Sequence, residues 1–172
     1  MAGLIHIYCG DGKGKTTAAM GLILRAAGNG KRVLLTQFLK DGKGAELDSL
    51  RHLEQVDIVP QTQEFGFTWT LTEEEKAEAR VYNTALLETA FIRGAAFNLL
   101  VLDEAIGAIG AGMIEESRLL ELLGEKPVEL EVVMTGRGPS QALMNTADYV
   151  TEMRKIKHPF DNGISARPGI EY

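Results

Sequence analysis

The chain has 172 residues, with 18 Lys and Arg against 24 Asp and Glu and a net charge of −6. This length predicts one domain over residues 1–172, large enough for a hydrophobic core of its own. The acidic balance excludes broad binding to nucleic acid or anionic membranes, because both need a basic surface, so an anionic ligand has to meet a local cationic site.

The first predicted element is an apolar strand, Leu4–Tyr8, which leads into a glycine-rich turn and then a helix from Lys15 to about Ala27. Backbone N–H groups at such a helix start have no helical partners, and the helix dipole adds positive charge, so a polyphosphate fits there. Lys15 is expected to reach phosphate oxygens and the Thr16 hydroxyl to ligate Mg²⁺. The predicted phosphate site comprises Gly10, Asp11, Gly12, Lys13, Gly14, Lys15, Thr16 and Thr17.

This turn departs in one respect from the pattern G-x-x-x-x-G-K-[ST] of nucleotide-binding P-loops. The pattern has Gly where this chain has Cys9, and counting from Gly10 leaves the loop one residue short. A turn that only caps a helix is the alternative, but it does not explain three glycines interleaved with two lysines. Cys9 is also the only cysteine, which excludes an internal disulfide and favours an intracellular setting.

Five further runs of strand length alternate with helical stretches: Arg32–Phe38, Val56–Val59, Leu99–Asp103, Leu130–Thr135 and Tyr149–Met153. Several of these runs are continuously apolar, as expected for strands buried on both faces of a parallel sheet. They predict an α/β protein with the three-layer, RecA-like fold of P-loop NTPases and a mostly parallel sheet of about six strands. No apolar run approaches 18 residues and no cationic leader is present, which predicts a cytoplasmic protein without membrane contact.

A long helix is predicted to begin after Thr72 and to extend towards Gly94. Thr72 and Glu75 have the spacing of a capping box, and the acidic run Glu73–Glu75 suits the helix dipole. We interpret this run as a solvated helix start and not as a metal site.

Two irregular stretches, Lys40–Gly44 and Pro60–Leu71, follow predicted strands, and loops at that end of a parallel sheet carry function. The second stretch holds Phe65, Phe67 and Trp69. Such aromatic side chains either meet a flat apolar ligand or pack on the domain, and the residues alone favour packing.

Polar residues follow two of the later strands. Asp103 and Glu104 end an apolar strand in the Walker B pattern, which places a carboxylate beside the metal ion held by the P-loop threonine. On its own, an acidic pair after an apolar run mostly marks the end of a strand, but the P-loop earlier in the chain favours a functional role for it. Arg137 follows Leu130–Thr135 and is expected at the same edge, where it binds triphosphate or forms a surface ion pair with Asp148 or Glu152.

The C-terminal stretch, residues 155–172, is rich in Pro and Gly and predicts an irregular tail that wraps the domain. His158 within it is a candidate base or ligand, although a lone His before Pro is more often a structural hydrogen-bonding group. Three scattered histidines and one cysteine make no metal cluster.

The full set of motifs closely resembles the corrinoid adenosyltransferases of the CobA/BtuR type, and the resemblance spans nearly the whole chain. It rests on seven segments: Gly10–Ala19, Gly66–Trp69, Leu102–Glu104, Thr135–Gly138, Ala147–Met153, Lys157–Phe160 and Gly169–Tyr172. In that family a Co(I) corrinoid attacks C5′ of ATP, a cobalt–carbon bond forms and triphosphate leaves. The resemblance implies the same reaction here, with ATP bound in reverse relative to ordinary P-loop enzymes, which gives a reason for the shortened loop.

The resemblance also implies roles for individual residues. The catalytic set is Lys15, Thr16 and Glu104, and the metal, Mg²⁺ or Mn²⁺, would be held by Thr16, Asp103 and Glu104. Residues 10–17 would bind ATP together with Arg25 and Arg137. The corrinoid would lie against Phe67 and Trp69, which displace its lower axial ligand, with Phe65 and His158 on the same side.

The family further suggests a homodimer and a reductase that supplies the electron for Co(I). Its members commonly carry an N-terminal lid segment before the first strand, whereas here Met1 almost directly precedes that strand. We therefore expect either a natural short form or closure by a partner segment. Two other functions stay open from the residues: an ordinary P-loop ATPase or phosphotransferase, and an ATP-dependent corrinoid delivery protein.

Overall fold

The computed structural model describes residues 2–40, 42–66 and 70–171. Within them six strands form one sheet in the order β3-β2-β4-β5-β1-β6, and every strand pairing in it is parallel. The strands are β1 Ile5–Cys9, β2 Val33–Gln37, β3 Val56–Ile58, β4 Leu99–Asp103, β5 Glu131–Thr135 and β6 Tyr149–Glu152. The predicted α/β fold with a parallel sheet of about six strands is thus confirmed.

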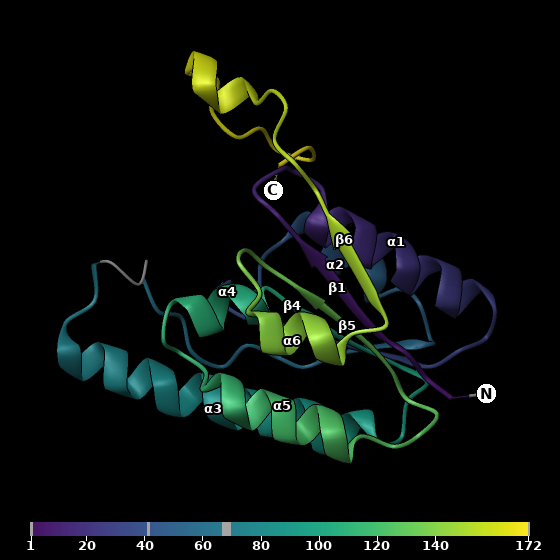
Figure 1. Ribbon diagram of the computed structural model, residues 1–172. Helices are drawn as coiled ribbons and strands as arrows, with labels where there is room; N and C mark the ends of the chain where they lie inside the picture. The colour runs from purple at the N-terminus through teal and green to yellow at the C-terminus, as the bar shows by residue number, and fades with distance from the viewer. Residues whose placement is uncertain (1, 41, 67–69, 172) are drawn as a thin grey trace.

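Helices cover both faces of this sheet (Figure 1). They are α1 Lys15–Gly28, α2 Ala45–Leu50, α3 Glu73–Gly94, α4 Ala105–Gly110, α5 Glu116–Glu125 and α6 Gln141–Thr146. Buried side chains of α1 and α2 pack on one face, and those of α3, α4, α5 and α6 pack on the other. The result is the three-layer arrangement that the alternation of strands and helices predicts.

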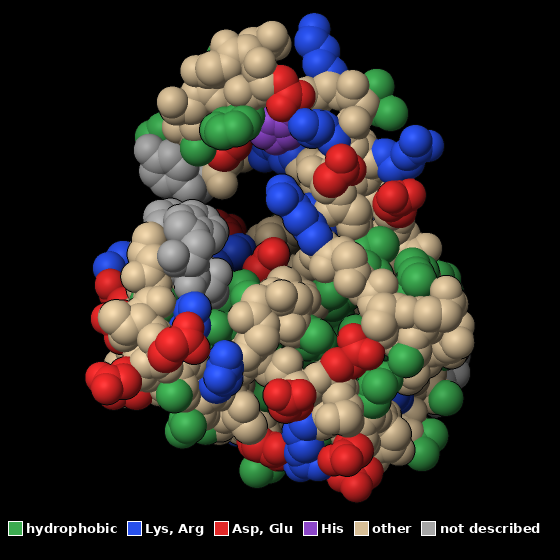
Figure 2. All heavy atoms as spheres, turned by 60° about the vertical axis from the view of Figure 1, so that its left-hand side comes forward, with side chains coloured by type: hydrophobic (Ala, Val, Ile, Leu, Met, Phe, Trp, Pro, Cys, Tyr) green, Lys and Arg blue, Asp and Glu red, His purple; other side chains and the backbone are tan. Residues whose placement is uncertain are grey.

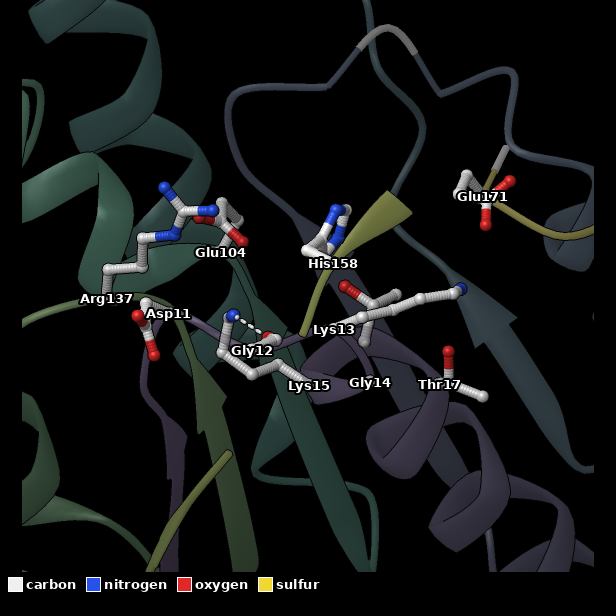
Figure 3. Close-up of a pocket in the computed structure, with 11 residues that line it drawn as sticks. Asp11, Gly12, Lys13, Gly14, Lys15, Thr17, Glu104, Arg137, His158 and Glu171 are labelled. Atoms are coloured by element: carbon white, nitrogen blue, oxygen red, sulfur yellow. Dashed lines mark hydrogen bonds between the residues drawn. The ribbon is translucent and has the colours of Figure 1, made fainter. Parts of the chain in front are cut away.

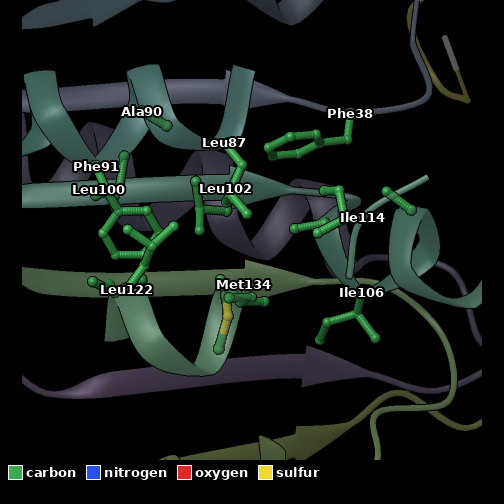
Figure 4. Packing of buried hydrophobic residues seen from close by; sticks show 14 of the residues in the cluster. Phe38, Leu87, Ala90, Phe91, Leu100, Leu102, Ile106, Ile114, Leu122 and Met134 are labelled. Carbon is green, nitrogen blue, oxygen red and sulfur yellow. The ribbon is translucent and has the colours of Figure 1, made fainter. Parts of the chain in front are cut away.

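Strand β4 shows why its sequence is continuously apolar. Leu99 and Val101 belong to the cluster beneath α1, whereas Leu100 and Leu102 belong to the cluster beneath α3 and α5. Successive side chains of a strand point to opposite faces, so a strand covered on both sides needs an apolar residue at every position. Figure 4 shows the second cluster, in which Phe91 lies against the central strands.

The long helix α3 begins as its sequence predicts. The Glu75 N–H donates to Thr72 Oγ1 at 3.2 Å, and the Thr72 N–H donates to Glu75 Oε2 at 2.8 Å, which completes the capping box. Glu73 lies at the surface and pairs with Lys76 at 2.8 Å. The acidic run is therefore a solvated helix start, as expected.

Five segments of the candidate site follow strands and lie at the same end of the sheet, because parallel strands end on the same side. These are the P-loop after β1, the segment around Lys40 after β2, Glu104 after β4, Arg137 after β5 and the tail after β6. Strand β5 lies between β1 and β4. Strand β1, which leads into the P-loop, and the Walker B strand β4 therefore end on the same side of the sheet, although they are not neighbours.

The C-terminal tail corrects one expectation. It contains a short 3₁₀ helix, Pro159–Asn162, that begins at His158, so the tail is not wholly irregular. It also does not wrap the domain: it extends beyond β6 and turns back towards the P-loop (Figure 1). Figure 2 shows the tail standing off the body with a hollow between them. Among the described helices, none has the length and apolar character needed to cross a bilayer.

Candidate functional site

The P-loop, residues 10–14, is held against the end of β6. The Gly12 N–H donates to the Met153 carbonyl at 2.7 Å, and a Cβ on Gly12 would lie 2.6 Å from that oxygen. A Cβ on Gly10 would lie 2.4 Å from it, and Gly10 has a φ of 101°. Gly14 precedes α1 with a φ of 116°. Each glycine of the loop is therefore required, either by its backbone angle or by the close approach of Met153.

A pocket of about 360 Å³ opens beside this loop (Figure 3). Its size lies in the range typical of ligand sites. Eleven residues line it: Asp11, Gly12, Lys13, Gly14, Lys15, Thr16, Thr17, Glu104, Arg137, His158 and Glu171. The pocket thus joins the P-loop, the ends of β4 and β5 and the C-terminal tail.

Lys15 is the most buried cation of this pocket. Its Nζ donates to the carbonyl oxygens of Gly10 and Gly12, both at 2.8 Å. Burial lowers the pKa of Lys15, and the nearby Arg137 guanidinium lowers it further, while Glu104 opposes the shift. Two cations that destabilise each other in this way gain most from a polyanion placed between them.

Asp103 lies at the end of β4 with its side chain fully buried. Its Oδ1 accepts from Thr16 Oγ1 at 3.0 Å and from Thr135 Oγ1 at 2.8 Å. Its Oδ2 accepts from Gln37 Nε2 at 3.0 Å and from Lys40 Nζ at 2.7 Å. Because four donors surround this carboxylate, it orients the Thr16 hydroxyl more readily than it binds a ligand itself.

Glu104 reaches the pocket through an unusual backbone conformation. Its φ is 61°, a left-handed value that non-glycine residues rarely adopt, and its N–H donates to Thr135 Oγ1 at 2.8 Å. A Cβ on Gly107 would lie 2.6 Å from Glu104 Oε1, so glycine there leaves room for the carboxylate in this position. Burial raises the pKa of Glu104, and the Asp103 carboxylate raises it further.

The tail closes one side of the pocket. Lys13 Nζ donates to the Ile170 carbonyl at 2.7 Å, and the Lys155 N–H donates to Asp11 Oδ1 at 3.0 Å, which lowers the pKa of Asp11. Glu171 pairs with Arg167, whose hydrogen bonds lower the pKa of Glu171 to about 2. The glycine-rich loop is thus tied to the far end of the chain through Lys13 and Asp11.

Comparison with known proteins identifies the family. Residues 1–172 match the family described as ATP:corrinoid adenosyltransferase BtuR/CobO/CobP. This chain belongs to the ATP:corrinoid adenosyltransferase family. It is 33% identical over 171 residues to the corrinoid adenosyltransferase of Escherichia coli (strain K12), covering 99% of this chain and 86% of that protein.

Two further relatives carry the same name. The corrinoid adenosyltransferase of Pseudomonas aeruginosa is 33% identical over 172 residues, which cover 99% of this chain and 84% of that protein. The corrinoid adenosyltransferase of a Sinorhizobium species is 35% identical over 181 residues, which cover 99% of this chain and 80% of that protein. Similarity to members of the adenosyltransferase family therefore extends over nearly the whole sequence.

Residues expected to bind ATP in this family are brought together, with one exception. Residues 11–17 and Arg137 line the pocket, and Gly10 accepts the Lys15 hydrogen bond behind it. Arg25 lies on the last turn of α1, ten residues from Lys15 and hence about 15 Å along the helix. Arg25 interacts electrostatically with the Tyr8 hydroxyl and does not line the pocket. Its expected role at the nucleotide has no support from this position.

Residues expected to bind the corrinoid are only partly described. Phe67 and Trp69 lie outside the described residues. Phe65 is half-buried and packs on the domain against Tyr82, with ring centroids 5.6 Å apart. His158 lines the P-loop pocket, and its Nδ1 accepts from the Phe160 N–H at 3.2 Å, so it also has the structural role that the sequence favoured.

The oxygen donors at the pocket suit a metal ion that arrives with a nucleotide. Mg²⁺ takes one or two protein ligands and completes its octahedron with phosphate oxygens and water. Thr16 and Glu104 offer such oxygens at the pocket wall. Among the described residues, no group of three or more His, Cys, Asp or Glu side chains could hold a metal on its own.

Sequence reasoning did not single out four residues that organise this site. They are Gln37, Lys40, Thr135 and Gly107, which hold Asp103 or make room for Glu104. Lys40 lies in a loop that the sequence marked as functional, and Thr135 ends a predicted strand, so position gave a partial signal for both. For Gln37 the sequence carried no signal, because its role depends on which strands are neighbours. The role of Gly107 depends on the left-handed backbone at Glu104, three residues earlier, which no sequence pattern marked.

Proposed function

We propose that this protein transfers the 5′-deoxyadenosyl group of ATP to the cobalt of a reduced corrinoid. In this reaction a cobalt–carbon bond forms at C5′, the C5′–O bond breaks and triphosphate leaves with the electron pair. The observation that carries the proposal is membership of the ATP:corrinoid adenosyltransferase family over residues 1–172. The pocket at the P-loop supports it, because Lys13, Lys15 and Arg137 place positive charge on its lining and a departing triphosphate needs such charge around it.

The reaction requires the protein to position the two substrates and to place positive charge around the triphosphate. Co(I) of the corrinoid substrate is the nucleophile, so no protein nucleophile is required. Cys9, the only thiol, is buried, and burial raises its pKa, which keeps it unreactive. Lys15 would exchange its two carbonyl partners for phosphate oxygens, and Arg137 would approach the same anion from the end of β5.

We further propose that Mg²⁺ or Mn²⁺ accompanies the triphosphate and meets Thr16 and Glu104. Such an ion would offset phosphate charge when bound. The hydrogen bond from Thr16 Oγ1 to Asp103 Oδ1, 3.0 Å long, supports this assignment because it aims the hydroxyl lone pairs away from the sheet. Asp103 then acts through Thr16 rather than as a direct ligand.

The corrinoid is assigned to the aromatic loop and the tail. We propose that Phe65, Phe67 and Trp69 approach its lower face and that His158 lies on the same side of the site. The contact of Phe65 with Tyr82 supports a fixed base for this loop. An electron-donating reductase, a homodimer and a cytoplasmic setting complete the proposal.

Product analysis tests the proposal. Protein, ATP, MgCl₂ and chemically reduced Co(I) corrinoid should yield an alkylated corrinoid with its altered visible spectrum, together with triphosphate in equal amount. Release of ADP and phosphate instead would indicate an ordinary ATPase or phosphotransferase. Corrinoid bound in an ATP-dependent manner but left unalkylated would indicate a delivery protein.

A further inference from the structure

Lys40 places its ammonium group at the point where the P-loop threonine meets the Walker B carboxylate. Its Nζ lies 2.7 Å from Asp103 Oδ2 and 3.4 Å from Thr16 Oγ1. The Lys40 side chain is 31% exposed, whereas the Asp103 side chain is fully buried. A cation of the protein itself therefore stands beside the hydroxyl that a metal ion would use.

The backbone is built to hold Lys40 in this place. The Phe38 N–H donates to the Asp103 carbonyl at 2.9 Å, and the Phe38 side chain is fully buried, so β2 is anchored to β4 up to that residue. Leu39 then adopts a φ of 54°. Leu39 and Glu104 are the two non-glycine residues with positive φ among those described, and they flank this centre. Strain of this kind persists only where the surroundings enforce it.

We propose that Lys40 is the resident cation of the nucleotide-free site and excludes a free divalent metal ion from Thr16. The inference rests on the proposed function in one respect, that a metal–triphosphate binds at Thr16. A metal ion about 2.1 Å from Thr16 Oγ1 would lie within about 5.5 Å of the Lys40 ammonium, where two cations repel strongly in a partly buried site.

The triphosphate removes this conflict. A metal ion that enters with the polyphosphate brings net negative charge, and the Lys40 ammonium gains phosphate oxygens in exchange for Asp103. Lys40 thus acts as a selectivity residue: it admits the metal as a nucleotide complex and rejects the ion alone. The competing explanation is that Lys40 only neutralises Asp103, which predicts an effect on stability and none on metal affinity.

Binding of Mn²⁺ alone, measured on the full chain by the electron paramagnetic resonance signal of free Mn²⁺, separates these explanations. Lys40→Met removes the charge and keeps most of the side-chain volume, and Lys40→Gln removes the charge but keeps a donor for Asp103. Without nucleotide, we expect both variants to bind Mn²⁺ at least tenfold more tightly than the wild type does. Lys43→Met is the matched control, since Lys43 lies on the same loop, is 66% exposed and pairs with Glu64. Its Mn²⁺ affinity should stay within twofold of the wild type.

An unchanged Mn²⁺ affinity in a folded Lys40 variant would overturn the inference, and Lys40→Gln decides the matter if Lys40→Met does not fold. The wild-type chain gives a second reading: millimolar MgCl₂ without nucleotide should leave its melting temperature unchanged, whereas MgCl₂ with ATP should raise it. A rise with MgCl₂ alone would contradict the exclusion of the free ion. The Mn²⁺ assay contains neither ATP nor corrinoid, so its failure and a failure of adenosyl transfer are separate results.

Discussion

Asp103→Asn removes the charge at the centre of the site while keeping the size of the side chain. The carboxylate now accepts from four donors: Thr16, Thr135, Gln37 and Lys40. An asparagine amide has one acceptor oxygen where the carboxylate has two. Whichever way the amide turns, two of the four donors lose their acceptor.

The cost follows from where those donors lie. In one orientation of the amide, Thr135, which is fully buried, and Thr16 lose their acceptor. In the other orientation, Gln37, which is 2% exposed, and Lys40 lose theirs. A buried donor without an acceptor costs about 1–3 kcal/mol. The second, partly exposed donor finds water and costs about 1 kcal/mol. We therefore expect the free energy of unfolding to fall by about 2–4 kcal/mol, or roughly 5–15 °C in melting temperature for a domain of this size.

Urea unfolding followed by circular dichroism at pH 7 measures this change without nucleotide or metal. Asp57→Asn on strand β3, which is separated from β4 by β2, is the matched control, because Asp57 is 48% exposed and lies 3.5 Å from Arg93. That variant should stay within about 0.5 kcal/mol of the wild type. A similarly small change for Asp103→Asn would refute the four-donor network as a stabilising element.

Three further predictions concern the pocket and α3. Lys15→Met should leave the melting temperature within a few degrees of the wild type while lowering kcat by about 10²–10³ in the product assay, since one electrostatic group stabilises a leaving anion on that scale; a near-normal kcat would remove Lys15 from the site. Glu104 has a pKa raised above its ordinary 4.5, so its ionisation destabilises the fold increasingly as pH rises from that value to the raised pKa of the folded protein, and by a constant amount beyond it. Glu104→Gln should therefore gain stability over the wild type as pH rises from 4.5 in urea titrations and keep that gain at higher pH, and a difference that does not grow above pH 4.5 would contradict the burial argument. Thr72→Ala breaks the capping box and should cost about 1 kcal/mol of unfolding free energy, whereas the exposed Thr89→Ala within the same helix should cost less; equal losses would show that the cap adds nothing.

Local patterns predicted the elements well because each depended on residues close together in the chain. The strand, glycine turn and helix at residues 4–28 follow from apolar alternation, from backbone angles that glycine permits and from helix polarity. The start of α3 follows from Thr72 and Glu75, three residues apart. The prediction for the tail was less accurate, because a composition rich in Pro and Gly does not determine the path of the chain after it leaves the sheet.

The location of individual site residues was harder to predict. The family resemblance predicted that Arg25 helps to bind the nucleotide, but Arg25 lies in the last turn of α1, away from the pocket. His158 is some 140 residues from the P-loop in sequence, but the pairing of β6 with β1 returns the tail to it. Such proximity is a property of strand order, which no local pattern encodes.

The sequence by itself determined the parallel α/β fold, the P-loop and the acidic end of β4, because hydrophobic periodicity, glycine and helix polarity act over a few neighbouring residues. Only the tertiary structure decided what surrounds Asp103. The register of β2 against β4 sets Gln37 opposite Asp103, and β5 then adds Thr135 from the other side. The left-handed turn at Leu39 finally directs Lys40 onto the same carboxylate. A buried charge has to collect its donors from whichever strands become its neighbours, and that choice is made by the packing of the whole sheet.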